Sequence, residues 1–391
     1  MKKRALLYHL LIVFSLGVSC REKYLPPVID NSVSYLVVDG TIINGPDSTL
    51  IRLSKTKKLQ EDPTTGGLTN ASVTLEDIEG ATIYNLYQLN NNGVYGVGGM
   101  SLDLNKKYKL RINTADGGRY LSDELTVTDT PPIDSLNWQK KDDGVTIYVN
   151  THDPSAKTNY YRWEYVETYD YRVNNYSIIK YRQSPYPDSS FVDRTPAEQI
   201  YHCWKTANST TVFLSSTLNL KEDIVNLVPL RFIPTAAIEL SSQYSILAKQ
   251  FALTRQAFEY MLNLKRISEQ MGSLFDVQPS EIAGNIHNVD NPDEPVVGFV
   301  AASSLQQKRI FITRAQVNPW NYSYYCSVPK IVPMDLDSIR TYFGGPSPYL
   351  IPIDRIIDLR TGKTTDVHGG EPLCVDCQSH GGTTSQPDFW Q

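Results

Sequence analysis

Short runs of alternating apolar and polar residues, separated by turn sequences, fill residues 35–130 of this 391-residue chain. The clearest run is KYKLRI at residues 107–112, where every second side chain is apolar. Such alternation is typical of strands that bury one face. The other runs are residues 35–42, 49–53, 71–77, 93–96 and 125–127, with a turn at Asn44-Gly45-Pro46-Asp47 and a hairpin turn near 116–120. About seven such strands predict an immunoglobulin-like β-sandwich over residues 35–130.

The sequence TPPID at residues 130–134 predicts a domain boundary, because prolines stiffen the extended linkers between domains. Strand patterning resumes after it, and we expect residues 160–170 and 176–182 to pair as a long hairpin. Further strands are predicted at residues 135–138, 144–149, 211–214, 296–302 and 309–314. The tail from Thr361 is rich in Gly, Thr and Ser and is expected to be irregular. We therefore predict a mainly β protein, with a second, larger β-rich domain over residues 131–391.

Residues 244–271 interrupt the strand pattern, because their apolar residues recur at roughly helical spacing. Gly272 is suited to end such a helix, since glycine readily adopts the left-handed conformation of a C-terminal cap. An alternative division is a strand followed by a helix that begins after Thr254 as its N-cap. Either division predicts an amphipathic helical insertion near residues 244–272, laid on a sheet.

Cys20 follows a sequence typical of an export signal, namely the basic residues of 1–4, an apolar run over 5–16 and the small residues of 17–19. A cysteine at the cleavage position describes a bacterial lipoprotein signal, and the apolar run has only about half the length of a membrane-spanning helix. Leu16 lies four residues before the cysteine instead of the usual three, and an ordinary secretory signal is the alternative. We predict a signal peptide over residues 1–19 and a covalent diacylglycerol and N-acyl (palmitate) lipid on Cys20, with no other cofactor.

Residues 20–34 contain Pro26-Pro27 and lack a periodic apolar pattern. We therefore expect a tether that joins the lipid to the fold. A tethered protein of this kind works at a membrane surface, and the cell-surface and periplasmic faces both stay open on this evidence.

The charges exclude some classes of partner. Lys and Arg total 37 against 42 Asp and Glu, for a net charge of −5, and the basic residues are dispersed instead of forming a stripe. This composition argues against a nucleic-acid partner. The 25 tyrosines against 11 phenylalanines are either half-buried strand residues or, alternatively, a ligand-binding surface, since tyrosine supplies flat amphipathic contact area.

Four cysteines follow Cys20, and an even number in an exported chain favours disulfides. The candidates are Cys203, Cys326, Cys374 and Cys377. The short spacing favours a local Cys374–Cys377 bridge with a long Cys203–Cys326 bridge, although sequence alone allows three connectivities.

A weaker alternative for the C-terminal cysteines is a metal site. His368, Cys374, Cys377 and His380 lie within thirteen residues, and two thiolates with two imidazoles suit tetrahedral zinc. A redox role for the CVDC sequence is weaker still, because it requires a helix that begins at the first cysteine.

Several stretches together resemble a known bacterial family. They are residues 271–303, which include GNIHNVDNPDEPVVGFVAAS, Tyr161-Arg162-Trp163-Glu164, Cys203-Trp204, and the CVDC ending followed by Gly381-Gly382 and Pro387-Asp388-Phe389-Trp390. The chain resembles the Bacteroidota lipoproteins known as domain of unknown function 4249 over nearly its whole mature length. The resemblance implies a lipoprotein of the cell outer membrane, often encoded beside TonB-dependent transporters, and it implies no catalytic residues.

The block at 271–303 also has a physical interpretation of its own. Its glycines, prolines and asparagines favour a rigid, irregular loop. Such a loop is either a binding element, with Asn285, His287, Asn288 and Asp290 as candidates, or a structural belt across the two β regions.

These observations lead us to expect a non-enzymatic binding or accessory component of a TonB-dependent transport system, with an outer-membrane barrel as partner. It would be anchored in the outer membrane and would face the cell surface, with the periplasmic face as the alternative. A surface adhesin or envelope scaffold is the second hypothesis, and a hydrolase with an unrecognised site is the third, because this class of fold serves all three. No nucleophile elbow, HExxH, P-loop or GxGxxG sequence is present, so no catalytic residue is predicted.

Overall fold

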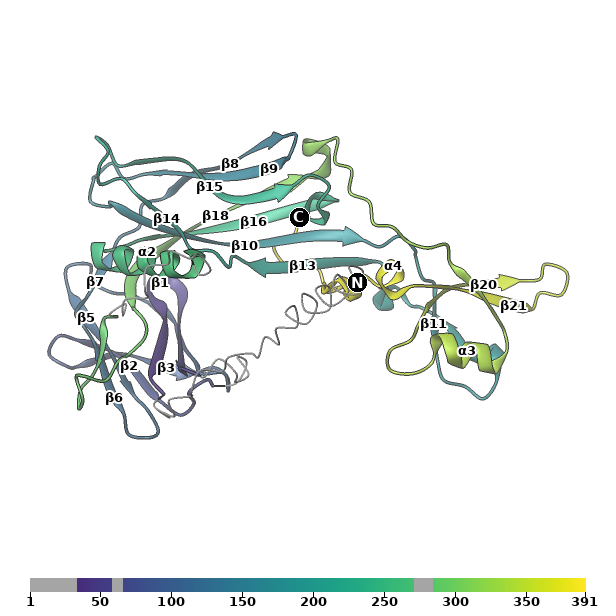
Figure 1. The fold of residues 1–391 in the computed structure, drawn as a ribbon, viewed down its shortest axis with the longest axis horizontal. Coiled ribbons are helices and arrows are strands. Elements are labelled where there is room, and N and C mark those ends of the chain that lie inside the picture. The colour runs from purple at the N-terminus through teal and green to yellow at the C-terminus, as the bar shows by residue number, and fades with distance from the viewer. Residues whose placement is uncertain (1–33, 58–65, 271–283) are drawn as a thin grey trace, which may run out of the picture.

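The computed structural model describes residues 34–57, 66–270 and 284–391. Strands make up 48% of it and helices 13%, so the prediction of a mainly β protein is confirmed. A large mixed sheet runs through the molecule, and smaller sheets pack beside it (Figure 1). The predicted signal peptide, Cys20 and the tether up to residue 33 lie outside the described residues, as does Gly272.

The N-terminal strands form one end of the large sheet. They run in the order β1-β4-β3-β2-β5-β6-β17, and β7 pairs with β5. Their bounds are β1 Leu36–Lys55, β2 Ser72–Asp77, β3 Thr82–Gln88, β4 Val94–Met100, β5 Lys107–Asn113, β6 Arg119–Ser122, β7 Leu125–Thr128 and β17 Ile286–Asn288. The alternating burial of β5 follows directly from its sequence, since Tyr108, Leu110 and Ile112 are all buried.

The expected turn at residues 44–47 is wrong, because β1 is one continuous strand. Its register with β4 shifts between Gly45 and Ser48. This bulge accommodates the proline and the glycine that suggested a turn, and the strand continues beyond it.

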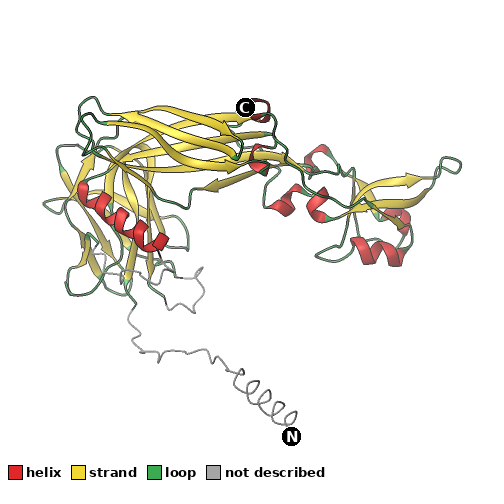
Figure 2. Cartoon of the chain, turned by 45° about the horizontal axis from the view of Figure 1, so that its top comes forward, coloured by secondary structure: helices red, strands yellow, loops and turns green. Residues whose placement is uncertain are grey.

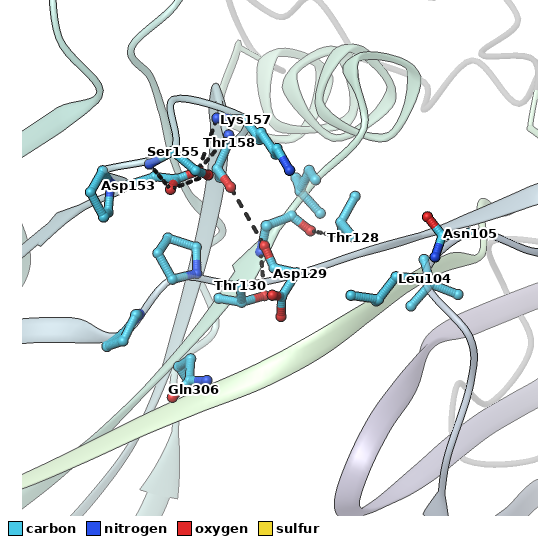
Figure 3. A pocket seen from close by; sticks show the side chains of 16 residues that line it. Leu104, Asn105, Thr128, Asp129, Thr130, Asp153, Ser155, Lys157, Thr158 and Gln306 are labelled. Atoms are coloured by element: carbon cyan, nitrogen blue, oxygen red, sulfur yellow. Dashed lines mark hydrogen bonds between the residues drawn. The ribbon is translucent and has the colours of Figure 1, made fainter.

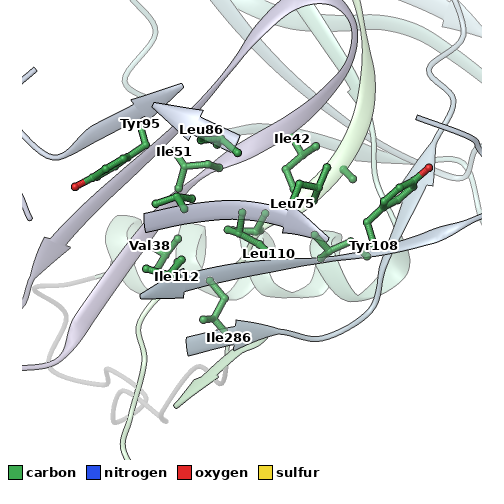
Figure 4. Packing of buried hydrophobic residues seen from close by; sticks show 14 of the residues in the cluster. Val38, Ile42, Ile51, Leu75, Leu86, Tyr95, Tyr108, Leu110, Ile112 and Ile286 are labelled. Atoms are coloured by element: carbon green, nitrogen blue, oxygen red, sulfur yellow. The ribbon is translucent and has the colours of Figure 1, made fainter. Parts of the chain in front are cut away.

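The core of the N-terminal strands is continuous and apolar (Figure 4). Val38, Ile51 and Leu110 come from different strands of this unit and are buried together. Ile286 and Val300, from far along the chain, complete the same core. This core therefore combines residues between Leu36 and Val127 with residues between Ile286 and Ala302.

Strand β18, Ala301–Thr313, joins the N-terminal strands to the rest of the large sheet. Its first residues pair with β1 in parallel, from Thr41↔Ala301 to Asn44↔Ser304. Its later residues pair with β16 in antiparallel, from Phe251↔Leu305 to Gln243↔Thr313. The two separate strands predicted at 296–302 and 309–314 are thus a single strand beginning at Ala301.

The other strands of the central region form two layers (Figure 1). The large sheet continues as β16-β10-β13, and β14 also pairs with β10, while a three-stranded sheet β15-β9-β8 covers it. Side chains such as Val145, Ile147 and Tyr244 fill the space between them. The bounds are β8 Ile133–Lys141, β9 Gly144–His152, β10 Tyr160–Arg172, β13 His202–Asn208, β14 Phe213–Ser216, β15 Ile224–Pro234 and β16 Gln243–Ala252. The expected hairpin of 160–170 with 176–182 is wrong, because β10 pairs with β13, β14 and β16 instead.

The helical insertion divides into a strand and a helix. Strand β16 ends at Ala252, and helix α2 spans Arg255–Gln270. Thr254 accepts a hydrogen bond from the amide of Ala257 at 3.2 Å, which is the N-cap interaction considered as the alternative. Ala257 and Met261 pack on Ile43 and Phe251, so α2 lies against the junction of the two β regions (Figure 2).

A small C-terminal arm projects from the central region (Figures 1 and 2). We use this name for residues 176–194 and 327–370. Sheets β11-β12 and β19-β21-β20 and helix α3 pack around Phe191, Ile339, Phe343 and Val367. The bounds are β11 Ile179–Tyr181, β12 Phe191–Asp193, β19 Lys330–Pro333, α3 Leu336–Phe343, β20 Ile351–Ile357 and β21 Thr364–Gly370.

The tail after the arm returns to the central sheet. Short helix α4, Pro372–Val375, leads into a 3-10 turn at Cys377–His380. Thr383 then exchanges two backbone hydrogen bonds of 2.8 Å with Trp204 in β13. Near the C-terminus Trp390 is buried against Phe311. None of the helices in the described part of the chain has the length and apolar character that crossing a membrane requires.

Gly298 is the position where close backbone packing most strictly requires glycine. Its φ is +132°, and a Cβ there would lie 1.9 Å from the carbonyl oxygen of Val38. We expect Gly298→Ala to lower the free energy of unfolding by about 3 kcal/mol, because backbone strain and overpacking both act. Gly117→Ala is the control, since Gly117 has a φ of +95° in open space and should cost about 1 kcal/mol. Denaturant unfolding measures both, and equal effects of the two variants would contradict this account.

Candidate functional site

The four candidate binding residues lie in β17 and directly before and after it, at the edge of the N-terminal strands. Asn285 is buried and forms a reciprocal pair with Val300, donating to its carbonyl at 2.8 Å and accepting from its amide at 2.9 Å. Asn288 accepts hydrogen bonds from the amides of Asp290 and Asn291. These contacts close the loop on itself.

The two charged candidates also have partners within the fold. His287 lies 3.1 Å from a carboxylate oxygen of Asp123, and Asp290 forms an ion pair with Arg119. Hydrogen bonding to Arg119 lowers the pKa of Asp290, which favours its ionised form. The segment therefore has the contacts of a structural belt, which favours that alternative over a binding loop.

The four cysteines form two disulfides, and the pairing differs from the one favoured by spacing. Cys203 bonds Cys377 with a Cα separation of 5.6 Å, and Cys326 bonds Cys374 at 5.9 Å. Cys374 lies in α4 and faces the segment before β19, whereas Cys377 lies in the next turn and faces β13. Sequence proximity indicated a local bridge, but the tail is bonded on one side to β13 and on the other to the segment before β19.

The alternative metal set is not assembled. Cys374 and Cys377 are each in a disulfide, so neither offers a thiolate. His368 bonds Asp354 at 2.5 Å, and His380 bonds the carbonyl of Leu373 at 2.8 Å. Within residues 34–57, 66–270 and 284–391, no three His, Cys, Asp or Glu side chains lie where they could hold a metal ion.

A cavity of about 760 Å³ lies where the N-terminal strands meet the central region (Figure 3). The predicted boundary lines it, through Thr130, Pro131 and Pro132, and Asp129 and Lys157 bring charge to it. No local sequence pattern indicates a cavity here, and the available signal was the TPPID sequence, part of which lines it.

Asp153 lines this cavity, and both of its carboxylate oxygens accept hydrogen bonds from its own turn (Figure 3). One carboxylate oxygen of Asp153 accepts from the amide and hydroxyl of Ser155, and the other accepts from the amides of Lys157 and Thr158. Partial burial alone would raise the pKa of Asp153, but hydrogen bonds from Ser155 and Thr158 outweigh burial and lower the pKa to about 2. A carboxylate held in this way organises a turn and is poorly suited to act as a general acid.

A second cluster, Asp170, His202 and Ser242, has the residue types of a hydrolytic triad. His202 Nε2 lies 2.8 Å from Asp170, and Ser242 donates to the same carboxylate oxygen at 2.9 Å. A triad needs the serine hydrogen-bonded to the histidine, with the acid on the far side of the ring. Here His202 and Ser242 both bond Asp170. The serine–histidine hydrogen bond that would activate the serine is therefore not formed.

Comparison with known proteins identifies one family. A family model described as "Domain of unknown function (DUF4249)" matches residues 21–309, which is more than half of the chain. The resemblance noted from the sequence is thereby confirmed, and the CVDC ending lies beyond the matched residues. No curated protein matches the chain.

Two solved structures of α2-macroglobulin from Escherichia coli show a weak likeness. The trypsin-activated form shares 9% identity, with 85% of this chain and 17% of that chain covered and a TM-score of 0.18. The form activated by porcine elastase shares 11% identity, with 57% and 19% covered and a TM-score of 0.19. The chain thus spans less than a fifth of the length of either, and scores this low carry no argument about fold or function.

The disulfide pairing can be mapped directly. Cleavage on the N-terminal side of Asp376 separates Cys374 from Cys377, so mass spectrometry of the unreduced protein should find Cys377 linked to Cys203 and Cys374 linked to Cys326. Opening the long-range bridge with Cys203→Ala and Cys377→Ala together should lower the free energy of unfolding by about 2–5 kcal/mol. A peptide carrying a Cys374–Cys377 bond, or four free thiols, would contradict the structure.

Asp153 should contribute to acid sensitivity. Because its folded pKa is lowered, its stabilising effect is present above the ordinary aspartate pKa of about 3.9 and is lost as the pH falls toward 2. We expect Asp153→Asn to destabilise the protein at neutral pH and to flatten the decline of the denaturation midpoint between about pH 4 and 2. Asp142→Asn, in the exposed turn between β8 and β9, is the control and should leave the curve of the parent protein unchanged.

Proposed function

The chain belongs to the DUF4249 family, and from this premise we propose that it is a lipid-anchored outer-membrane protein serving as a non-enzymatic binding or accessory component of a TonB-dependent transport system. The lipoprotein signal ending at Cys20 supports the anchor. The family resemblance supports the outer membrane and the transporter partner. The proposed orientation is toward the cell surface, with the periplasmic face as the alternative.

The observation that carries the proposal is the apolar surface of the C-terminal arm and the segment leading into it. Val328 is 90% exposed and Tyr349 is 76% exposed. Other large apolar side chains exposed there are Tyr176, Ile178, Tyr186, Tyr325, Ile331, Ile357 and Leu359. Exposed apolar surface of this kind marks contacts with proteins or membranes, and the arm projects far enough to present it (Figure 1).

The arm is also held rigidly enough to serve as a contact surface. The Cys326–Cys374 disulfide joins the segment that enters the arm to the segment that leaves it. Ser327 bonds Glu371 at 3.0 Å beside the same bridge. A surface fixed in this way loses little conformational entropy when a partner binds.

We further propose that the N-terminal strands are an immunoglobulin-like β-sandwich. Their antiparallel pairings, the alternating burial of β5 and the single apolar core support this assignment. Such a unit would serve as the membrane-proximal part, because β1 begins directly after the tether.

A surface adhesin or envelope scaffold is the second hypothesis, and an exposed apolar arm suits it too. It differs in its partner: glycan or host protein instead of an outer-membrane barrel. A hydrolase is favoured less, because Ser242 bonds Asp170 and not His202.

A pulldown tests the transporter proposal. The full-length tagged protein, extracted from its native membrane in mild detergent, should recover a TonB-dependent barrel. We expect the pair Val328→Ser and Tyr349→Ser to reduce that recovery about tenfold, as loss of apolar contacts worth about 1.4 kcal/mol would. The control is Tyr87→Ser in β3, because Tyr87 is similarly exposed at 67% but lies on the N-terminal strands.

Two outcomes would overturn the proposal. One is recovery of no outer-membrane barrel by the parent protein. The other is undiminished recovery by the arm variant, which would remove the arm from the contact. Binding to a glycan array without a barrel partner would favour the adhesin instead.

A further inference from the structure

A second cavity, of about 410 Å³, is lined by Arg172, the last residue of β10. This end of β10 points toward the arm (Figure 1). Arg314 from the turn after β18 also lines the cavity. Tyr201, Tyr322 and Tyr324 supply aromatic side chains, and Ser242 also lines the cavity. None of its lining residues carries a carboxylate, so the cavity is basic and aromatic.

Both guanidinium groups have donor capacity to spare. Arg172 donates to the hydroxyl of Ser242 at 3.4 Å, and Arg314 donates to the carbonyl of Trp320 at 3.3 Å. An arginine has five N–H donors in a planar fork that matches carboxylate and phosphate oxygens. Among the residues that the structure describes, neither arginine forms an ion pair with an acidic side chain.

Ser242 is oriented so that it holds Arg172 at the cavity. Its hydroxyl donates to Asp170 at 2.9 Å and so accepts from Arg172. Asp170, the carboxylate that Ser242 bonds, is only 4% exposed. Burial alone would raise the pKa of Asp170, whereas hydrogen bonds from His202, the Gln243 amide and Ser242 lower it. With three donors already bound, Asp170 does not neutralise the arginine by direct contact.

The aromatic wall of the cavity is fixed at both ends. Trp320 is buried and donates its indole N–H to the carbonyl of Ala237 at 2.8 Å. Six residues later the Cys326–Cys374 disulfide secures the chain again. Between these anchors Tyr322 packs on the central core, and the carbonyl of Tyr324 accepts from the side chain of Asn174 at 3.1 Å.

We propose that this cavity binds a small organic anion of the acidic-sugar class. The two guanidinium groups hold its carboxylate or phosphate, and the three tyrosines contact its body through rings and hydroxyls. The cavity is large enough for a compact ligand, given that small-molecule sites span about 300–1,000 Å³. The inference adds a ligand to the proposed function, and purified protein tests it without a transporter.

Calorimetric titration of the purified full-length protein tests the proposal with galacturonic acid, a galacturonic acid trimer, glucose 6-phosphate and glucose as probes. We expect at least one acidic sugar to bind and glucose not to bind. Binding of the uronic acids alone would assign a carboxylate ligand, and binding of the sugar phosphate alone would assign a phosphate ligand. Arg172→Gln and Arg314→Gln should each weaken that binding at least tenfold and reduce its dependence on salt.

Arg52→Gln is the matched control, because it removes the same charge from an exposed position on β1 and should leave the affinity unchanged. Circular dichroism establishes that each variant is folded before titration. Equal binding of glucose, unaltered affinity in both cavity variants, or no binding of any probe at millimolar concentration would each overturn the proposal. Failure here and failure of the pulldown are distinguishable, since the two experiments use different surfaces.

Discussion

Strand β18 hydrogen-bonds the N-terminal strands at its beginning and the central strands along the rest of its length, and the architecture depends on this sharing. At residues 301–304 it lies between β1 and β7, both parallel to it, and from Leu305 onward β16 runs antiparallel to it. Without this strand the core of the N-terminal unit would lack Ala302, and β16 would lose its link to β1. Two regions that are distant in sequence are therefore bonded into one sheet, with many backbone hydrogen bonds that each contribute about 1 kcal/mol.

Buried polar side chains reinforce the same junction. Thr130 contacts Ser303 and Ser304 of β18 through its hydroxyl and amide, and it accepts from the amide of Ala252 in β16. Gln250 is fully buried and accepts from the indole of Trp163 while donating to the carbonyl of Pro131. Each group is satisfied, so the polar network specifies one arrangement of the two regions. The sequence TPPID is thus a bonded joint and not a free linker.

Local sequence patterns predicted where several strands lie, but they did not predict which strands pair. KYKLRI and the run at residues 71–77 identified β5 and β2 because alternation is a property of consecutive residues. Thr254 likewise identified the start of α2 from a single cap. The partner of β10 was missed because three strands from distant parts of the chain pair with it, and no local signal distinguishes them from the nearer hairpin. The cysteine pairing and the two cavities were not predicted for the same reason, because each depends on residues that are distant in sequence. Arg172 and Arg314, for example, are 142 positions apart and are brought to one cavity only by the fold.

The nested disulfides place a demand on how the protein is made. Cys326–Cys374 lies within the span of Cys203–Cys377, and the last of these four cysteines to be synthesised is the partner of the first. A chain oxidised in the order of its emergence would pair Cys203 with Cys326, and the two late cysteines would then be left to pair with each other. Correcting that arrangement requires attack of a thiolate on a disulfide sulfur through mixed-disulfide intermediates. From that state, the native pairing is reached only by rearranging disulfides as well as forming them.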